Sequence, residues 1–124
     1  MPTDNTNRLA GTAYITVDGV TYLLRGSFLY NPSKVTRESL VGMDGVHGYK
    51  ETPIAGSISG KFTDASNVSV ASFNNMTNVT IVVELANGKT VVGRNMWTVE
   101  NQEVDSEEAS FDVKWEGRDV KESK

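Results

Sequence analysis

VTIVVELANGKTVVGRNMWTV, residues 79–99, holds two runs of β-branched and apolar residues on either side of Asn87-Gly88. Asn-Gly is typical of a two-residue turn between antiparallel strands, because both residues tolerate a positive φ. The stretch therefore predicts a β-hairpin in which Val79 to Leu85 pairs with Thr90 to Val99. A chain built around such a hairpin is expected to be mainly β.

The residues that follow add one more strand. An acidic connection, Glu100 to Glu108, leads into SFDVKWEG, residues 110–117, where apolar and charged residues alternate. Alternation at period two predicts a half-buried strand. The predicted core side holds Phe111, Val113 and Trp115. The predicted outer side holds Asp112, Lys114 and Glu116. The tail, residues 118–124, is polar and is expected to fray.

The residues before the hairpin also favour strands. GTAYITVDGVTYLLRGSFLY, residues 11–30, is divided by Asp18-Gly19, a second turn signal. It predicts strands over about Thr12 to Val17 and Val20 to Leu29. One face of the second strand would carry Tyr22, Leu24 and Phe28, and the other Arg25, Ser27 and Leu29.

A further alternating run, TPIAGSISGKF, leads into a possible helix. The run predicts a core side with Ile54, Ile58 and Phe62. Its other side is small and polar, with Ser57, Ser59 and Lys61. Residues 63–78 are the one helix candidate, with Asp64 or Ser66 as its N-cap and Asn78 at its end.

These elements predict the fold class. We expect a mainly β protein, an antiparallel β-barrel or sandwich of about six strands with one short flanking α-helix. Asn31-Pro32 ends a strand, so residues 31–53 are expected to form a long inter-strand loop. We expect one domain over residues 1–124, with flexible polar ends at 1–10 and 118–124.

Composition narrows the function classes. The chain has 124 residues, no cysteine and a formal net charge of −4. Disulfide frameworks and thiolate zinc sites are therefore excluded, and a protein that binds by neutralising phosphates is disfavoured. No run approaches the ~18 apolar residues of a membrane span, and the N-terminus lacks a signal-peptide core. We expect a soluble protein made in a cytoplasm, without membrane insertion.

The stretch GMDGVHGYKETP, residues 42–53, has the residue types of a phosphate or catalytic loop. Its glycines match no phosphate-binding motif. His47 with Asp44 and Ser39 lacks an oxyanion-hole signature. The acidic cluster within residues 100–108 lacks the ligand spacing and turning glycine of a calcium loop. We therefore predict no catalytic, cofactor-binding or metal-ligating residue.

With these elements in place, the chain resembles the tail tube proteins of contractile-tailed, Mu-like bacteriophages over roughly residues 10–117. The resemblance is carried by residues 11–28, GMDGVHGYKETP, residues 79–99 and FDVKWEG. It implies a structural virion protein, made in the bacterial host cytoplasm, whose hexameric rings stack into a hollow tube. The implied partners are further copies of itself, the tail sheath, tape-measure, baseplate and tail terminator proteins, with DNA passing through the lumen.

Under this resemblance, residues 31–53 are expected to be an assembly loop. Its predicted inter-subunit contacts are Arg37, Asp44, His47 and Tyr49. Alternation does not distinguish lumen from outer wall, but we expect the lumen to receive Ser57, Ser59, Lys61, Asp112, Lys114 and Glu116.

The sequence also leaves other functional classes open. A related tube of a phage-derived bacteriocin or a type VI secretion system would share the fold. A capsid decoration or adhesion β-sandwich would bind a surface without forming tubes. An enzyme is the least supported class, because no nucleophile–base pair or cofactor loop is present.

Overall fold

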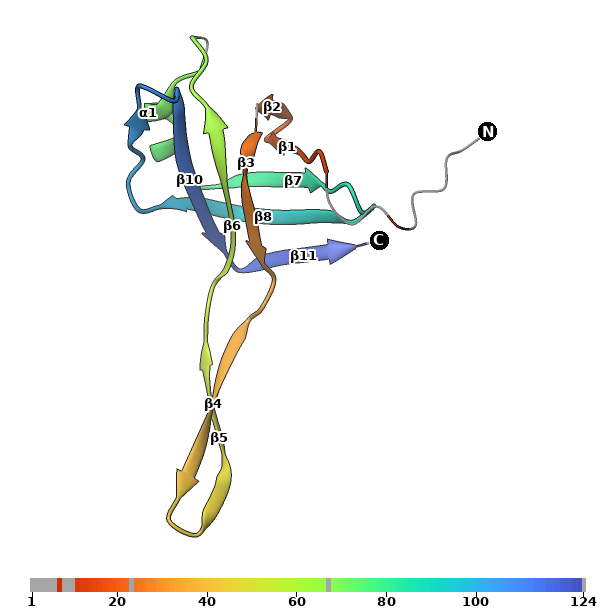
Figure 1. Cartoon of the computed structure of the whole chain (residues 1–124), viewed down its shortest axis with the longest axis vertical. Helices are drawn as coiled ribbons and strands as arrows, with labels where there is room; N and C mark the ends of the chain where they lie inside the picture. Colours follow the sequence, from red (N-terminus) through yellow and green to blue (C-terminus); the bar gives the residue numbers. More distant parts are fainter. Residues whose placement is uncertain (1–6, 8–10, 23, 67, 124) are drawn as a thin grey trace.

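The computed structural model describes residues 7, 11–22, 24–66 and 68–123, with the side chain of residue 27 also outside the description. These residues form eleven strands and one helix (Figure 1). They are β1 Tyr14–Val17, β2 Val20–Tyr22, β3 Leu24–Asn31, β4 Val35–Gly42, β5 Gly45–Pro53, β6 Gly56–Thr63, α1 Val70–Asn74, β7 Val79–Glu84, β8 Thr90–Val99, β9 Val104–Asp105, β10 Ser110–Gly117 and β11 Asp119–Ser123.

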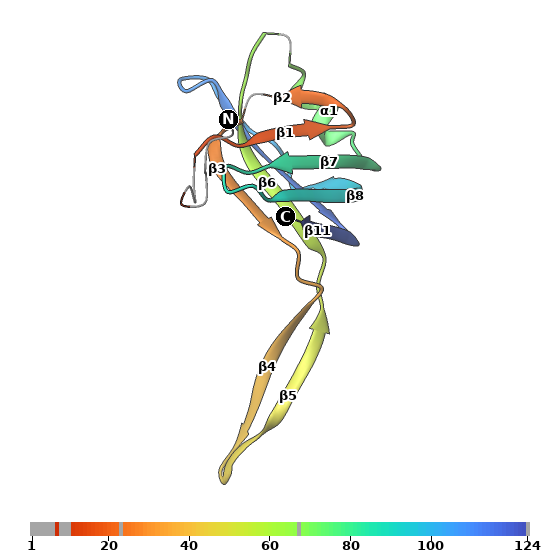
Figure 2. The ribbon, with the colours of Figure 1, turned by 90° about the vertical axis from the view of Figure 1, so that its right-hand side faces the viewer.

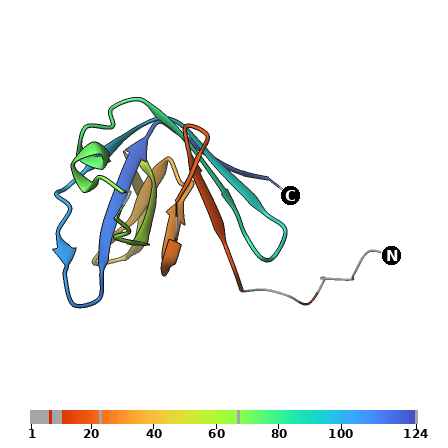
Figure 3. The ribbon, with the colours of Figure 1, turned by 90° about the horizontal axis from the view of Figure 1, so that it is seen from above.

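The body consists of two antiparallel sheets that share β8. The first half of β8 lies between β7 and β11 in a sheet that continues through β1 to β2. The last part, Trp97–Val99, pairs with β10, which is followed by β6 and β3. Asn95, between the two parts, has a φ of 54°, a conformation that asparagine tolerates. Seen from above, the two sheets diverge like a wedge from the region of β8 (Figure 3).

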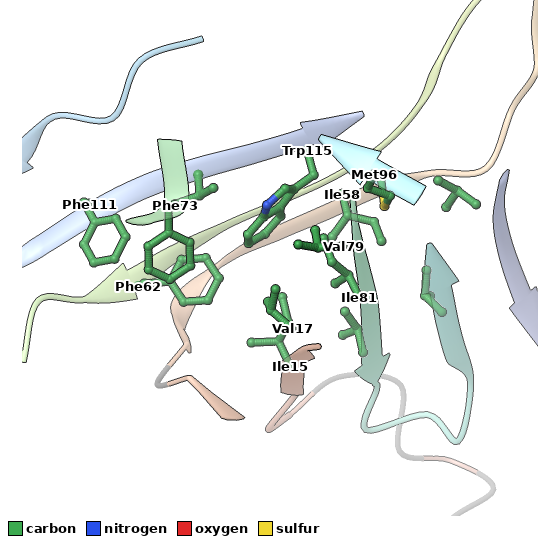
Figure 4. Close-up of a cluster of buried hydrophobic side chains, with 14 residues drawn as sticks. Ile15, Val17, Ile58, Phe62, Phe73, Val79, Ile81, Met96, Phe111 and Trp115 are labelled. Atoms are coloured by element: carbon green, nitrogen blue, oxygen red, sulfur yellow. The ribbon is translucent and has the colours of Figure 1, made fainter. Parts of the chain in front are cut away.

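The core lies between these sheets. Five of the predicted core residues are buried: Ile58, Phe62, Phe111, Val113 and Trp115. The rings of Phe62, Phe73, Phe111 and Trp115 lie together, with neighbouring centroids 5.4–6.1 Å apart (Figure 4). The prediction for Ile54 is wrong, because it lies in the connection before β6 begins and is 36% exposed.

The first turn lies where the sequence predicted it, whereas the second predicted strand and the helix differ from the prediction. Asp18 and Gly19 form the β1–β2 turn with φ values of 49° and 85°. The second predicted strand is divided, because β2 and β3 belong to different sheets. The helix is shorter than predicted: Ser69, not Asp64 or Ser66, is its N-cap, and Asn75 is its C-cap. Few strong helix formers occur there, so only the turn that buries Phe73 is helical.

The largest correction concerns residues 31–53. Instead of a loop without strands, β4 and β5 form an antiparallel ribbon that runs away from the body, hereafter the arm (Figures 1 and 2). The backbone of Ile54 donates a hydrogen bond to Lys34, so the arm continues the β3–β6 pair almost without interruption. Every residue of β5 is exposed.

The predicted frayed tail is also corrected. Residues 119–123 form β11 along β8, and Val120 is buried against Gly56, where a larger side chain would collide with it. The prediction of a flexible N-terminus, residues 1–10, lies outside the described residues except for Asn7. Among the described residues, no helix is long and apolar enough to cross a membrane.

Candidate functional site

The six predicted lumen residues lie on one face of the β6–β10 pair, hereafter the polar face. Lys61 is opposite Asp112, Ser59 is opposite Lys114, and Ser57 is opposite Glu116. The opposite face of the same strands carries the buried core residues. The alternation that predicted this grouping is therefore real in the structure.

Neighbouring strands extend the polar face. Leu29 of β3 is opposite Ser59, and Val99 of β8 is opposite Lys114. These residues line a shallow hollow of about 670 Å³ that also includes Glu100 and Asn101. Sequence reasoning missed these four, because cross-strand register between distant segments cannot be read from alternation within a single segment.

The charges of the polar face are arranged around Lys114. Its Nζ lies 3.7 Å from Glu100 and 3.9 Å from Glu116. With Lys61 and Asp112, the face holds two lysines and three carboxylates. The face is therefore close to neutral with a slight acidic excess, and its ion pairs are open to solvent and individually weak.

The four predicted contact residues of the arm form two separate pairs. Near the body, the guanidinium of Arg37 lies 2.7 Å from Glu51 and 5.7 Å from the ring centre of Tyr49. These side chains share one face of the ribbon. At the tip, His47 Nε2 and Asp44 Oδ1 are 2.5 Å apart. The structure thus brings together two members of the predicted set at a time, not all four.

The tip owes its shape to a β-bulge. Leu40 is opposite Gly48 and Val41 is opposite Val46, so His47 is an extra residue on β5. Its ring lies over Gly42, where a side chain would collide with it. The hydrogen bond from His47, helped by a backbone hydrogen bond, lowers the pKa of Asp44. Ser39 lies farther along the ribbon, opposite Tyr49. The geometry therefore does not support a catalytic triad of Ser39, His47 and Asp44.

A third cluster joins β11 to β3. The hydroxyl of Tyr30 donates to Glu122 Oε2 at 2.7 Å, and Lys89 Nζ lies 3.4 Å from the same oxygen. The hydrogen bond from Tyr30 is the main cause of a lowered pKa of Glu122 and of a raised pKa of Tyr30. This cluster was not predicted from the sequence, because it depends on a strand in the tail that was expected to fray. Among the described residues, no group of three or more histidine, aspartate or glutamate side chains could hold a metal ion.

The sequence model of the phage tail tube protein family matches residues 6–122. The chain belongs to this family. The resemblance inferred from sequence is thereby confirmed, and the mainly β fold class with one short helix agrees with it. Members of the tail tube family are structural components of a virion or an injection system.

Solved structures of tube assemblies have the same fold as this tail tube family member. One chain comes from the sheath/tube terminator of an extracellular contractile injection system, PVC, in the extended state. It has a TM-score of 0.64 and 10% identity, over 100% of this chain and 98% of that chain. A chain of the PVC sheath-tube complex in the extended state has a TM-score of 0.62 and 10% identity, over 96% and 94%. In a comparison with curated protein sequences, none matches this chain.

The Tyr30–Glu122 bond gives a pH prediction for the tail tube protein. Because the pKa of Glu122 is lowered in the folded state, the bond stabilises β11 above the usual glutamate value of 4.5 and is lost as pH falls through the lowered value. Tyr30→Phe is therefore expected to lower the free energy of unfolding at neutral pH, with the difference shrinking in acid. Urea unfolding at neutral and at acidic pH measures this difference, with Tyr14→Phe, at an exposed tyrosine of β1, as the control. An equal difference at both pH values would contradict it.

Proposed function

We propose that this tail tube family member forms hexameric rings that stack into the inner tube of a contractile phage tail, the conduit for DNA ejection. The observation that supports this most is the arm. A β-ribbon of eight- and nine-residue strands, exposed on both faces, has no packing partner among the residues that the structure describes. An isolated two-stranded ribbon is marginally stable in water, so a neighbouring subunit would order it.

The edges of the sheet formed by β3, β6, β10 and the end of β8 supply the ring contacts in this proposal. Its outer strands are β3 on one side and β8 with β9 on the other. On β8, Thr98 donates its N–H to Met76 and its hydroxyl to Phe73, so carbonyls at the end of α1 already occupy part of this edge. Among the described strands, β9, where Val104 is 43% exposed, and β3 each have one partner and would pair with neighbours along the other edge.

In the assembled tube, the polar face would line the lumen with Ser57, Ser59, Lys61, Asp112, Lys114 and Glu116. A nearly neutral, slightly acidic wall gains little from counterion release, so it would not retain DNA phosphates. The proposed outer partner is the tail sheath protein. Tape-measure, baseplate and tail terminator proteins would contact the tube lumen and ends. The location is the virion, after synthesis in the host cytoplasm.

Reversing the lumen charge tests which face lines the lumen. Asp112→Lys with Glu116→Lys would give four lysines and one carboxylate on the polar face. Rings should still form, while genome ejection should slow, most strongly at low salt, where screening is weak. The control is Glu84→Lys with Glu107→Lys, which changes net charge equally at exposed sites elsewhere. Wild-type ejection in low salt by normally assembled particles would refute this lumen assignment but not the tube.

A second candidate is the tube of an injection system that carries no genome, such as a phage-derived bacteriocin, a type VI system or an extracellular contractile injection system. The similar PVC sheath and tube structures favour this alternative. Nucleic-acid content and mass spectrometry of the native particle distinguish it from a phage tail. A decoration or adhesion domain has no comparable support.

Assembly itself is tested by sedimentation and negative-stain microscopy of concentrated protein and of native particles. The proposal predicts six-fold rings or tubes. A species that stays monomeric at high concentration and is absent from tubes of the native particle would overturn it.

A further inference from the structure

The arm tip exposes a small apolar cluster that none of the described residues covers. Val41 and Val46 are 69% and 74% exposed, and Met43 between them is fully exposed. A strand of eight residues spans about 26 Å, so the tip lies far beyond the body. Figures 1 and 2 show no other element beside it. Grouped exposed apolar residues mark a binding surface, and the described part of the chain provides no partner for this one.

A groove suited to this tip lies on the body. It is a hollow of about 380 Å³ between residues 11–13, just before β1, and the first half of β3. Its apolar lining comes from Ala13, Leu24 and Phe28, and Leu24 and Phe28 also pack partly against the core. Arg25 lies in the same lining and is exposed, with its guanidinium donating to the backbone oxygen of Glu108.

The groove and the tip lie at opposite ends of one ribbon. β3 begins at the groove and leads into the arm, so the tip is the far end of the same continuous strand pair. Two different patches at opposite ends make a head-to-tail contact. Contacts of this kind do not close on a pair but repeat, into rings where the rotation closes and into open stacks where it does not.

Charge also matches between the two patches. Asp44 is the acidic side chain of the tip turn, and Arg25 is the cation of the groove. The bond from His47 holds the Asp44 carboxylate beside the apolar cluster, so apolar and acidic groups are presented together.

We propose that the arm tip of one copy docks into this groove of a second copy. Met43 would pack against Leu24 and Phe28, and Asp44 would face Arg25. The inference rests on the proposed stacking of rings and adds the acceptor surface for the arm.

Cysteine cross-linking tests the contact directly, because the chain has no cysteine of its own. Tubes carrying Met43→Cys and Ala13→Cys should form intermolecular disulfides on mild oxidation and give a ladder on a non-reducing gel. Each single variant should give no ladder. The spatial control is Met43→Cys with Lys121→Cys, because Lys121 is exposed on β11 away from the groove.

A charge exchange gives an independent readout. Asp44→Arg or Arg25→Glu alone should raise the critical concentration for assembly about twofold to fivefold, the range for one exposed ion pair. Combining them should restore assembly toward the wild-type value. Thermal unfolding of each variant identifies any change that only damages the fold.

The outcomes distinguish failure of the proposed groove contact from failure of the proposed tube. Tubes that form normally without a 13–43 disulfide would refute the groove while leaving the proposed function intact. Failure of the parent protein to form tubes would refute the proposed function instead. Disulfides between Ala13→Cys and Thr6→Cys within one chain of assembled tubes would show that the N-terminal residues occupy the groove, and would overturn the proposal.

Discussion

Shortening the arm is expected to abolish stacking and to leave the body folded. Ser39 and Tyr49 lie directly opposite each other in the ribbon, so Leu40–Gly48 can be replaced by Asn-Gly, the preferred two-residue hairpin turn. The removed residues include the whole tip and no core residue. Sedimentation should show rings or single subunits, without tubes, at concentrations where the wild type forms tubes.

Two further measurements make this result specific. The thermal midpoint should change by no more than a few degrees, since surface changes away from the core usually cost within about 0.5 kcal/mol. Thr52→Ala, an exposed change on the part of β5 that remains, is the matched control and should stack normally. Tubes of normal length from the shortened variant would show that the arm is not the stacking element.

Phe62→Ala is expected to cost about 3–5 kcal/mol of unfolding free energy, the usual range for removing a buried phenylalanine ring. Phe62 is 1% exposed, and its ring centroid lies 5.8–5.9 Å from those of Phe73, Phe111 and Trp115. Its removal would open a cavity where the two sheets and α1 meet. Domains of this size are stable by about 5–15 kcal/mol, so a large part of the stability would be lost.

Leu29→Ala is the matched control for this substitution. Leu29 lies on the strand next to β6 but is 68% exposed, so its truncation should cost no more than about 0.5 kcal/mol. Urea unfolding of the three proteins measures both values. Equal losses for the two variants would contradict the description of the core.

The parts of the fold that sequence predicted well are those where one face is buried. β8 and β10 were predicted with the bounds that the structure has, and the Phe111, Val113 and Trp115 side of β10 is buried. Burial of one face imposes alternation, and that alternation is visible in a single sequence. The grouping of the six polar-face residues followed from the same signal.

The strands of the arm and β11 were not predicted, for the opposite reason. Both faces of β5 are exposed, so no apolar alternation marks it as a strand. β11 has one buried residue, Val120, in an otherwise polar tail. Register contacts such as Tyr30 with Glu122, or Leu29 beside Ser59, join segments far apart in sequence and depend on the assembled sheets.

The continuity of the arm with β3 and β6 has a mechanical consequence. β6 is paired with β10 over its whole length and, on its other side, with β3 over most of it, with two irregularities in register. Backbone bonds in antiparallel ladders run perpendicular to the strands, so a pull along the arm loads many of them at once in shear instead of opening them one by one. Tension applied at the tip therefore enters the body through a strand that is paired on both sides.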